Sequence, residues 1–479
     1  LTRGATTEHT LLNAGFNLLG TSLAAQEYWD NHRALDYLLT RKDIDPEHIG
    51  VYGSSGGGTQ TAYYIGLDPR VKVAAICSFF STRERTMELQ GPSDGCQHIP
   101  YEGREQLEVP DFALMMAPRP LLILSGKYDF VDLWGAQQGY AELQQCYKVL
   151  GVPEKVDMLT VETGHGLGVE KRQKLVSWFK RWLKDDQSPV KKAAQDRFQL
   201  SDMLCTTRGQ VNVSMPGALS IMQENVNQLD EWASKREAFL SKGKKTVQAK
   251  MLDLLGLKGL PDHKIRIEAT GHDSMREYEQ YKFQLIREGE MPVPCILIIP
   301  SRANADSPVE LRLQEEGKGT YLSEYANFAA ALTEGKILLL ADLRGLGETT
   351  DPAFYTDAKY WNREYRNAMI SMHIGRPIMG QRVVDILTLL DFCSEHEFLK
   401  GHSVKVFANG IYGPAAIHAA YLDERINSVE ITHSVKTWKE YIERPMQWDM
   451  YSNVLYGALK YYDLPDLIRL SNRSIRFAD

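Results

Sequence analysis

The sequence repeats itself once, and this duplication restricts the chain to two lobes of one architecture. At an offset of 355 residues, Asp36-Tyr37 aligns with Asp391-Phe392 and Leu67–Val71 aligns with Leu422–Ile426. The register holds without a gap over roughly 75 positions, which chance similarity rarely produces. The shared pattern reads helix, strand, sharp turn, helix, strand. We therefore predict two related α/β lobes, each with its own core.

The two copies differ in where they begin and end. Four apolar runs typical of strands precede the second copy, at 264–268, 281–286, 294–299 and 337–341. The first copy has no such runs before its helix at 29–39, and the second ends within the strand that matches 119–124. We expect mostly parallel sheets flanked by helices, with a first lobe that lacks its leading strands and a second that lacks its tail.

A change in composition separates the two copies. Asp185 to Pro189 ends a predicted helix with polar residues and a proline, which is typical of a domain boundary. From Ala218 to Leu255 apolar residues recur at helical spacing, and Gly256 closes this run. The predicted domains are a first lobe at 1–186, a helical connector at 187–262 and a second lobe at 263–479.

The composition excludes several classes of protein. Of 479 residues, 43% are hydrophobic and 24% charged, and the net charge of -7 argues against a nucleic-acid surface. The longest apolar runs, such as Cys295–Ile299, are too short to cross a bilayer. Six scattered cysteines without a C-x-x-C pair predict no zinc site and no disulfide framework. The chain starts at Leu1, so we expect its natural start to lie upstream, and localisation stays open.

The run from Ile49 to Thr59 carries the strongest chemical signal. It is an apolar stretch that ends in Gly53-Ser54-Ser55-Gly56-Gly57, the spacing G-x-S-x-G, and then opens into a helix-like segment. A serine hydroxyl becomes a nucleophile when a sharp strand-to-helix turn presents it to a base. Ser55 is the candidate nucleophile. A glycine-rich turn that happens to contain serine is the alternative interpretation.

An acid and a base follow Ser55 in the order that this chemistry requires. After the predicted strand at 119–124, Asp129 lies on the loop beyond the strand's carboxyl end, and Asp132 on the same loop is the alternative acid. As a plain structural residue, Asp132 is a helix N-cap. His165 stands between two glycines just after the predicted strand at 155–161. Ser55, Asp129 and His165 form the predicted triad.

The oxyanion site and the second copy refine this prediction. The N–H of Gly56, the residue after the nucleophile, is one expected oxyanion donor, and the second is expected from an earlier loop. In the second copy the nucleophile position is Gly410, so that lobe is predicted to be structural or substrate-binding. The loop 342–348 lacks the G-x-G-x-x-G spacing, so no dinucleotide or other cofactor is predicted.

Several segments of the first lobe resemble the acetyl xylan esterase and dienelactone-hydrolase-like branch of the α/β-hydrolases. They include Arg33–Leu38, Ile44–Gly50, the elbow Gly53–Gly58 and Ala117–Pro120. The tandem arrangement resembles large bacterial proteins with a second, degenerate hydrolase lobe. This resemblance implies the α/β-hydrolase fold, export from the cell, and action on esters of plant polysaccharides.

A polar loop and a set of aromatic residues are the candidate substrate contacts. Gln97 and His98 follow a predicted strand where such folds place a lid, although a polar turn with a surface histidine is the alternative. Tyr128 and Trp134, with Trp29 and Phe130, could form a sugar-stacking platform, and core packing is the alternative.

The leading hypothesis is a serine carboxylesterase that hydrolyses acyl esters, acetyl above all, through an acyl-enzyme on Ser55. A peptidase or a uronic-acid methylesterase is the first alternative, because a triad does not fix the leaving group. The second alternative is a non-catalytic scaffold, which Gly410 favours. The expected partner is a small-molecule or carbohydrate ester, with no metal, nucleic acid or membrane, and the oligomeric state stays open.

Overall fold

The computed structural model describes residues 6–190, 198–352 and 362–478. It divides into two compact units, Leu1–Asn13 with Ser22–Ile221, and Ala14–Thr21 with Met222–Asp479. Helix α1 (Thr7–Leu18) contributes to both. The division into a first lobe, a connector and a second lobe stays a prediction, whereas the expectation of two α/β lobes is confirmed.

The first unit is built on a parallel four-stranded sheet in its described part, in the order β1-β2-β3-β4. Its strands are β1 (Gly50–Ser54), β2 (Val73–Cys77), β3 (Leu121–Gly126) and β4 (Val156–Val161). Its helices include α2 (Leu23–Leu38), α3 (Gly56–Tyr64), α4 (Arg83–Gln90), α5 (Val109–Leu114), α6 (Leu133–Val149), α7 (Val169–Lys184) and α8 (Val211–Ser214), with the short turn η1 (Gly95–Gln97).

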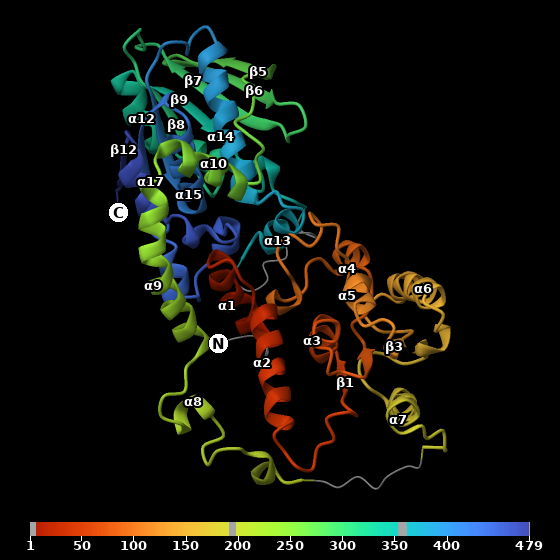
Figure 1. The fold of residues 1–479 in the computed structure, drawn as a ribbon. Helices are drawn as coiled ribbons and strands as arrows, with labels where there is room; N and C mark the ends of the chain where they lie inside the picture. The colour runs from red at the N-terminus through yellow and green to blue at the C-terminus, as the bar shows by residue number, and fades with distance from the viewer. Residues whose placement is uncertain (1–5, 191–197, 353–361, 479) are drawn as a thin grey trace. The chain divides into compact units, whose positions relative to one another are not determined.

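Alternation along the strands explains why this sheet has a helical layer on each face. Ala74 and Ile76 of β2 pack with α2, α3, α5 and α6, whereas Val73 and Ala75 pack with Leu175 of α7. Figure 1 shows α3 and α7 on opposite sides of β1. Because both faces are covered, β2 and β3 are buried along their whole length.

The second unit has a larger sheet, in the order β12-β11-β10-β8-β9-β7-β6-β5. Its strands are β5 (Arg266–Ser274), β6 (Tyr278–Ile286), β7 (Val293–Pro300), β8 (Val309–Leu313), β9 (Ile337–Ala341), β10 (Val404–Asn409), β11 (Ile426–Thr432) and β12 (Ser474–Phe477). The strands from β8 to β12 pair in parallel, and β5, β6 and β7 are antiparallel to their neighbours.

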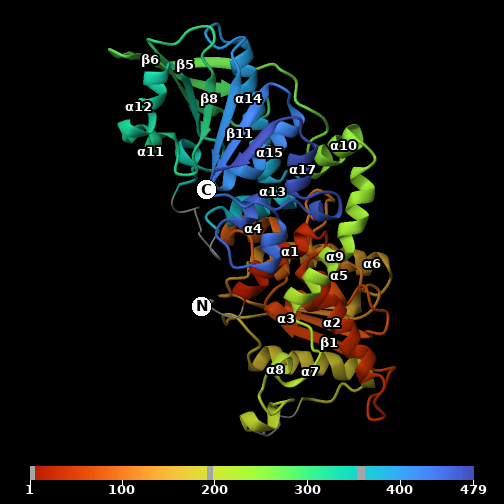
Figure 2. The ribbon, with the colours of Figure 1, turned by 90° about the vertical axis from the view of Figure 1, so that its left-hand side faces the viewer.

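Helices cover this sheet and precede it. Their bounds are α9 (Ile221–Leu240), α10 (Lys244–Leu254), α11 (Lys318–Ser323), α12 (Tyr325–Glu334), α13 (Tyr365–His373), α14 (Ile378–Glu395), α15 (Gly413–Leu422), α16 (Lys439–Glu443) and α17 (Leu464–Leu470). Figure 2 shows α15 beside β11, and α14 contacts α15, β6 and β7. The predicted helical run at 218–255 is two helices, α9 and α10, and Gly256 follows them with φ +72. None of the helices in the described ranges has the length and apolar character needed to cross a bilayer.

Candidate active site

Ser55 lies on a sharp turn between β1 and α3, where the sequence predicts it. Its φ of 59 and ψ of -122 are rare for any residue other than glycine, and such strain persists only where the surrounding structure holds it. The Ser55 N–H donates to the Cys77 carbonyl oxygen at 3.0 Å, which ties the turn to the end of β2. The Ser55 side chain therefore stands at the carboxyl edge of the sheet.

The glycines around Ser55 permit close backbone packing. A Cβ on Gly53 would lie 1.9 Å from the Gly57 carbonyl oxygen, and one on Gly58 would lie 2.7 Å from the Cys77 carbonyl oxygen. A Cβ on Gly57 would meet no atom within 4 Å. Gly53 and Gly58 are thus required by the tight turn, whereas Gly57 is not.

Asp129 and His165 meet at the same edge of the sheet. Asp129 follows β3 and His165 follows β4, and the Asp129 Oδ1 lies 2.7 Å from His165 Nδ1. The side chain of Asp129 is 1% exposed. Burial alone would raise the pKa of Asp129, but hydrogen bonds from His165 and the Val131 N–H, with a smaller contribution from Ser78, hold it below its usual value. The carboxylate is therefore charged when it faces the imidazole.

Asp132, the alternative acid, has a different role. It is the N-cap of α6, and its Oδ2 accepts from the Gly135 N–H at 2.6 Å and from Arg85 Nε at 3.3 Å. These contacts match the N-cap interpretation. The structure pairs His165 with Asp129.

His165 is also packed by an aromatic ring. Phe130 stacks on its imidazole with centroids 4.2 Å apart. Between Ser55 and His165 the described residues form no hydrogen bond, and such bonds are often long before substrate binds. The parallel strands β1, β3 and β4 bring the three predicted triad residues to one edge of the sheet.

Comparison with known proteins agrees with this fold. Residues 18–186 match the prolyl oligopeptidase family. The matched segment contains β1 to β4, whose parallel sheet with helices on both faces is that of the α/β-hydrolase fold, and it is called the hydrolase lobe below. Over 168 residues the chain is 26% identical to "Putative hydrolase YtaP" of Bacillus subtilis (strain 168), covering 35% of this chain and 56% of that protein. The chain thus spans about half the length of this relative.

Solved structures are similar to the chain at low identity. A "putative acetyl xylan esterase" of Bacteroides fragilis NCTC 9343 is 14% identical with a TM-score of 0.45, covering 55% of this chain and 75% of that chain. A glucuronoyl esterase from Solibacter usitatus is 11% identical with a TM-score of 0.37, covering 50% and 74%.

The sequence did not predict the buried lysine that contacts the loop carrying His165. Lys171 of α7 is fully buried, and its Nζ donates to Ser78 Oγ at 3.1 Å and to the Gly166 carbonyl oxygen at 3.0 Å. Ser78 Oγ also accepts from the Gly166 N–H at 3.1 Å. A signal exists in the sequence, because Lys171 falls on the apolar stripe of α7 with Leu175 and Trp178.

The predicted substrate contacts fall into two groups. Tyr128 and Trp134 are 66% and 53% exposed and belong to the segment after β3 that carries Asp129. His98 is buried, so it is not the surface histidine of the alternative interpretation. The Gln97 carbonyl oxygen accepts from Tyr63 Oη at 2.8 Å and from Arg83. Their contact with substrate stays a prediction.

Beneath this loop lies a buried ion pair that sequence reasoning missed. Arg83 and Glu102 are 1% and 2% exposed, and Arg83 Nε lies 3.0 Å from Glu102 Oε2. Tyr63 Oη lies 3.2 Å from the same carboxylate. This cluster fixes the segment that contains Gln97 and His98. Arg83 and Glu102 are separated in the sequence by other polar residues, so no spacing pattern predicts that they pair.

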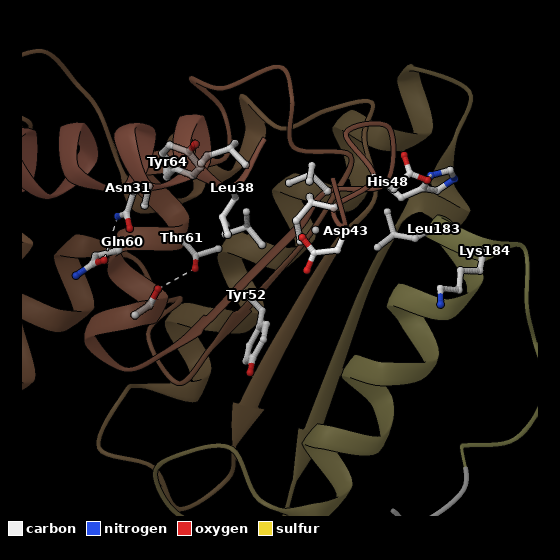
Figure 3. A pocket seen from close by; sticks show the side chains of 18 residues that line it. Asn31, Leu38, Asp43, His48, Tyr52, Gln60, Thr61, Tyr64, Leu183 and Lys184 are labelled. Carbon is white, nitrogen blue, oxygen red and sulfur yellow. Dashed lines mark hydrogen bonds and ion pairs between the residues drawn. The ribbon is translucent and has the colours of Figure 1, made fainter. Parts of the chain in front are cut away.

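A large cavity of the hydrolase lobe lies away from the triad. It has a volume of about 850 Å³, runs beside β1, and is lined by Leu38, Tyr52 and Thr61 among others (Figure 3). Ser55, Asp129 and His165 are not among its lining residues. In the described residues β1 is an edge strand, whereas its counterpart β10 also pairs with β8. The cavity therefore borders the edge that β8 covers in the other copy.

The second copy keeps the turn but has glycine at the position of Ser55. Gly410 has φ +61, close to the 59 of Ser55, and a Cβ there would lie 1.8 Å from Glu315 Oε2. The Ile411 N–H, which corresponds to that of Gly56, donates to Glu315 Oε2 at 3.1 Å. A carboxylate of the protein itself thus accepts from the N–H that corresponds to the predicted oxyanion donor of the first copy.

Proposed function

We propose that the hydrolase lobe is a serine carboxylesterase acting on acyl esters of a carbohydrate. The observation that carries this proposal is the strained Ser55 turn at the same sheet edge as the hydrogen-bonded Asp129 and His165. Order in the chain, loop position and backbone conformation agree with one chemistry.

The proposed reaction has two steps, acylation of Ser55 and its deacylation by water. Ser55 Oγ attacks the ester carbonyl and gives its proton to His165 Nε2, because Nδ1 is held by Asp129. The Gly56 N–H, first in α3 and without an intrahelical acceptor, stabilises the developing oxyanion. His165 protonates the leaving alcohol, and water then releases the acyl group from Ser55 by the reverse proton path.

A carbohydrate substrate is supported by the aromatic side chains around the histidine. Tyr128 and Phe130 flank Asp129 in sequence and, like Trp134, are more than half exposed. Exposed rings next to a nucleophile provide flat apolar surfaces on which a sugar ring can stack. The acetyl group is the proposed acyl part.

The second copy is proposed to be non-catalytic. Glu315 fills the space that a nucleophile at Gly410 would need, and it binds the Ile411 N–H. A structural or substrate-binding role follows for this copy.

The test compares Ser55→Ala with Ser54→Ala, its neighbour at the end of β1. Hydrolysis of a short chromogenic acetyl ester should fall by about 10⁴-fold or more in Ser55→Ala and persist in Ser54→Ala. A fluorophosphonate probe should label the wild type at Ser55. Unchanged hydrolysis in Ser55→Ala would overturn the proposal.

A peptidase or a uronic-acid methylesterase on the same triad is the alternative, and the description of the matching family favours the former. Acetylated xylan, methyl-esterified pectin and a chromogenic dipeptide should be assayed side by side. Turnover of the dipeptide or the pectin alone would replace the acetyl-ester proposal. Failure of the probe to label any serine would instead favour a non-catalytic scaffold.

A further inference from the structure

Three side chains that commonly bind metals converge in the first unit, outside the triad. They are His9 of α1, Glu27 of α2 and Cys96 of η1. One nitrogen, one oxygen and one sulfur atom from these residues all lie within 4.8 Å of one another. The turn η1 is far in sequence from the consecutive helices α1 and α2, so no spacing pattern in the sequence predicts the cluster.

The backbone around the cluster is held by contacts that do not involve the three side chains. The Gly95 N–H donates to Thr10 Oγ1 at 2.9 Å, and a Cβ on Gly95 would lie 2.9 Å from Thr10 Cα. Glycine at this position therefore lets η1 press onto α1 and places Cys96 beside His9. The Leu23 N–H donates to Asn13 Oδ1 at 2.8 Å, which ties the start of α2 to α1. The donor atoms are thus brought together by the fold itself.

Cys96 is buried, and the other two donors are partly buried and poorly satisfied by one another. Cys96 is 5% exposed, the Glu27 side chain 15% and the His9 side chain 34%. The His9 Nδ1 atom is buried without a hydrogen bond, since Glu27 Oε1 at 3.6 Å is beyond hydrogen-bond distance. Among the described residues, Glu27 forms no ion pair with lysine or arginine. Buried carboxylates are normally paired with a cation or coordinate a metal.

We propose that His9, Glu27 and Cys96 bind a zinc ion that fastens α1 and α2 to the loop of η1. A thiolate, an imidazole and a carboxylate are the ligands that zinc prefers, whereas magnesium and calcium favour oxygen alone. With metal–ligand bonds of 2.0–2.3 Å, tetrahedral ligand atoms stand about 3.5 Å apart, so small side-chain rotations close the site. The fourth position takes water or another ligand. The site is independent of the proposed esterase activity.

The ion would act on the loop that follows it. Cys96 immediately precedes Gln97 and His98, and the buried Arg83–Glu102 pair holds the far side of the same segment. Zinc at Cys96 would fix the near side to α1. The predicted role is therefore structural support of this loop, not activation of water at Ser55.

Cobalt and zinc titrations of the full chain test the site. The protein, purified without a histidine tag and stripped with a chelator, should bind one equivalent of Co²⁺ with a thiolate-to-cobalt charge-transfer band and tetrahedral visible bands, and Zn²⁺ should displace it. Zinc should raise the melting temperature. Cys96→Ser should abolish the charge-transfer band and weaken zinc binding by more than about 100-fold, beyond the loss expected for an outer-shell partner.

Matched controls make the result decisive. Cys205→Ser removes an exposed cysteine and should leave both titrations unchanged. His9→Gln and Glu27→Gln should each weaken zinc binding while the fold, followed by circular dichroism, persists. If Cys96→Ser does not fold, zinc should still protect Cys96 of the wild type from alkylation, as mapped by mass spectrometry. No charge-transfer band in the wild type, or equal zinc binding by Cys96→Ser, would overturn the proposal.

Discussion

At the scale of single residues, the two aspartates after β3 differ in their contacts, although the sequence offers both as the acid of the triad. Asp129 is buried and accepts from His165, whereas Asp132 caps α6. Both occupy one loop and both are carboxylates. Only the direction of each side chain distinguishes the carboxylate that faces the His165 imidazole from the one that caps a helix.

Asparagine substitutions at these positions should therefore differ in effect. Asp129→Asn removes the charge that stabilises the His165 imidazolium and should lower kcat/KM for an acetyl ester by about 10⁴-fold. Asp132→Asn keeps an equally good N-cap and should leave both activity and the melting temperature nearly unchanged. Steady-state kinetics on both variants measure this. Equal losses in the two variants would contradict the assignment.

Lys171 is the residue whose role the sequence did not suggest. Its ammonium group links Ser78 to the Gly166 carbonyl oxygen, directly after His165. Lys171→Met keeps the side-chain length and removes both hydrogen bonds of the ammonium group, so the loop that carries His165 should shift. We expect kcat/KM to fall by roughly 10- to 100-fold, the range that a misplacement of about 1 Å produces.

The control for this positioning role is Lys174→Met on the same helix. Lys174 forms an exposed ion pair with Asp157 at 2.5 Å and should be dispensable for activity. The split between kcat and KM is the readout that a merely structural role would leave in place: in Lys171→Met the loss should fall on kcat, with KM nearly unchanged. Unchanged kcat and KM would show that Lys171 does not position the loop.

Sequence reasoning could propose a triad because the proposed chemistry fixes residue type, order and loop position. Ser55, Asp129 and His165 each follow a strand in the expected sequence. Lys171 and Glu315 could not be found in this way, because their roles depend on contacts across the fold. Charged residues in such places have no fixed spacing from the groups they touch.

At the scale of elements, the strand–turn–helix around Ser55 depends on Gly53 more than on Gly57. Gly53→Ala would place a Cβ 1.9 Å from the Gly57 carbonyl oxygen, so the backbone turn must open. Gly57→Ala meets open space at the start of α3 and gains helix propensity of up to about 1 kcal/mol.

Urea unfolding and the rate of fluorophosphonate labelling should separate these two variants. Gly53→Ala should lower the unfolding midpoint and abolish labelling, whereas Gly57→Ala should keep or raise the midpoint and still be labelled. A folded, fully labelled Gly53→Ala would show that the close approach is not needed.

Strand prediction fails where charge is buried. Apolar runs predict the strands β6, β7 and β9, but they miss β8 because Val309–Leu313 contains Glu310 and Arg312. Glu310 is 1% exposed and is neutralised by Arg312 and by Lys336, whose Nζ lies 3.2 Å away. A buried charged residue interrupts the apolar run of a core strand, and its partners lie elsewhere in the sequence. A pattern of hydrophobicity therefore does not predict such a strand.

At the scale of the whole molecule, the duplication is visible in side-chain contacts as well as in strand order. Arg70 binds Asp36 and Asp68 at 2.6 Å each, and the aligned Arg425 binds Asp391 and Asp423 at 2.7 and 2.6 Å. The loops after β2 and β11 also agree, since Ser78 and the aligned His433 have φ of 49 and 52. Residues that align at the offset of 355 therefore form equivalent ion pairs in the two units.

The two ion-pair networks should nevertheless contribute differently to the stability of their units. Without the Arg70 side chain, the buried Asp68 loses its guanidinium partner and retains Tyr64, His32 and the backbone N–H of residue 70. Without Arg425, the buried Asp391 still contacts Arg287. Leaving a buried carboxylate without its cation is strongly destabilising.

We therefore expect Arg70→Met to destabilise the first unit by about 3 kcal/mol and Arg425→Met to destabilise the second by less.

The effect of Arg70→Met should also depend on pH. The hydrogen bond from Arg70 holds the pKa of Asp68 well below its usual value, so the folded state binds fewer protons than the unfolded state at low pH. The stabilisation is present above the unfolded pKa of about 3.9 and is lost as the pH falls below it. Hydrogen exchange by mass spectrometry at pH 7 should thus show faster exchange in β2 and α3 for Arg70→Met and a smaller change in β11 and α15 for Arg425→Met. The difference in unfolding free energy between wild type and Arg70→Met should narrow below about pH 3.9, and a difference independent of pH would show that Asp68 does not rely on Arg70.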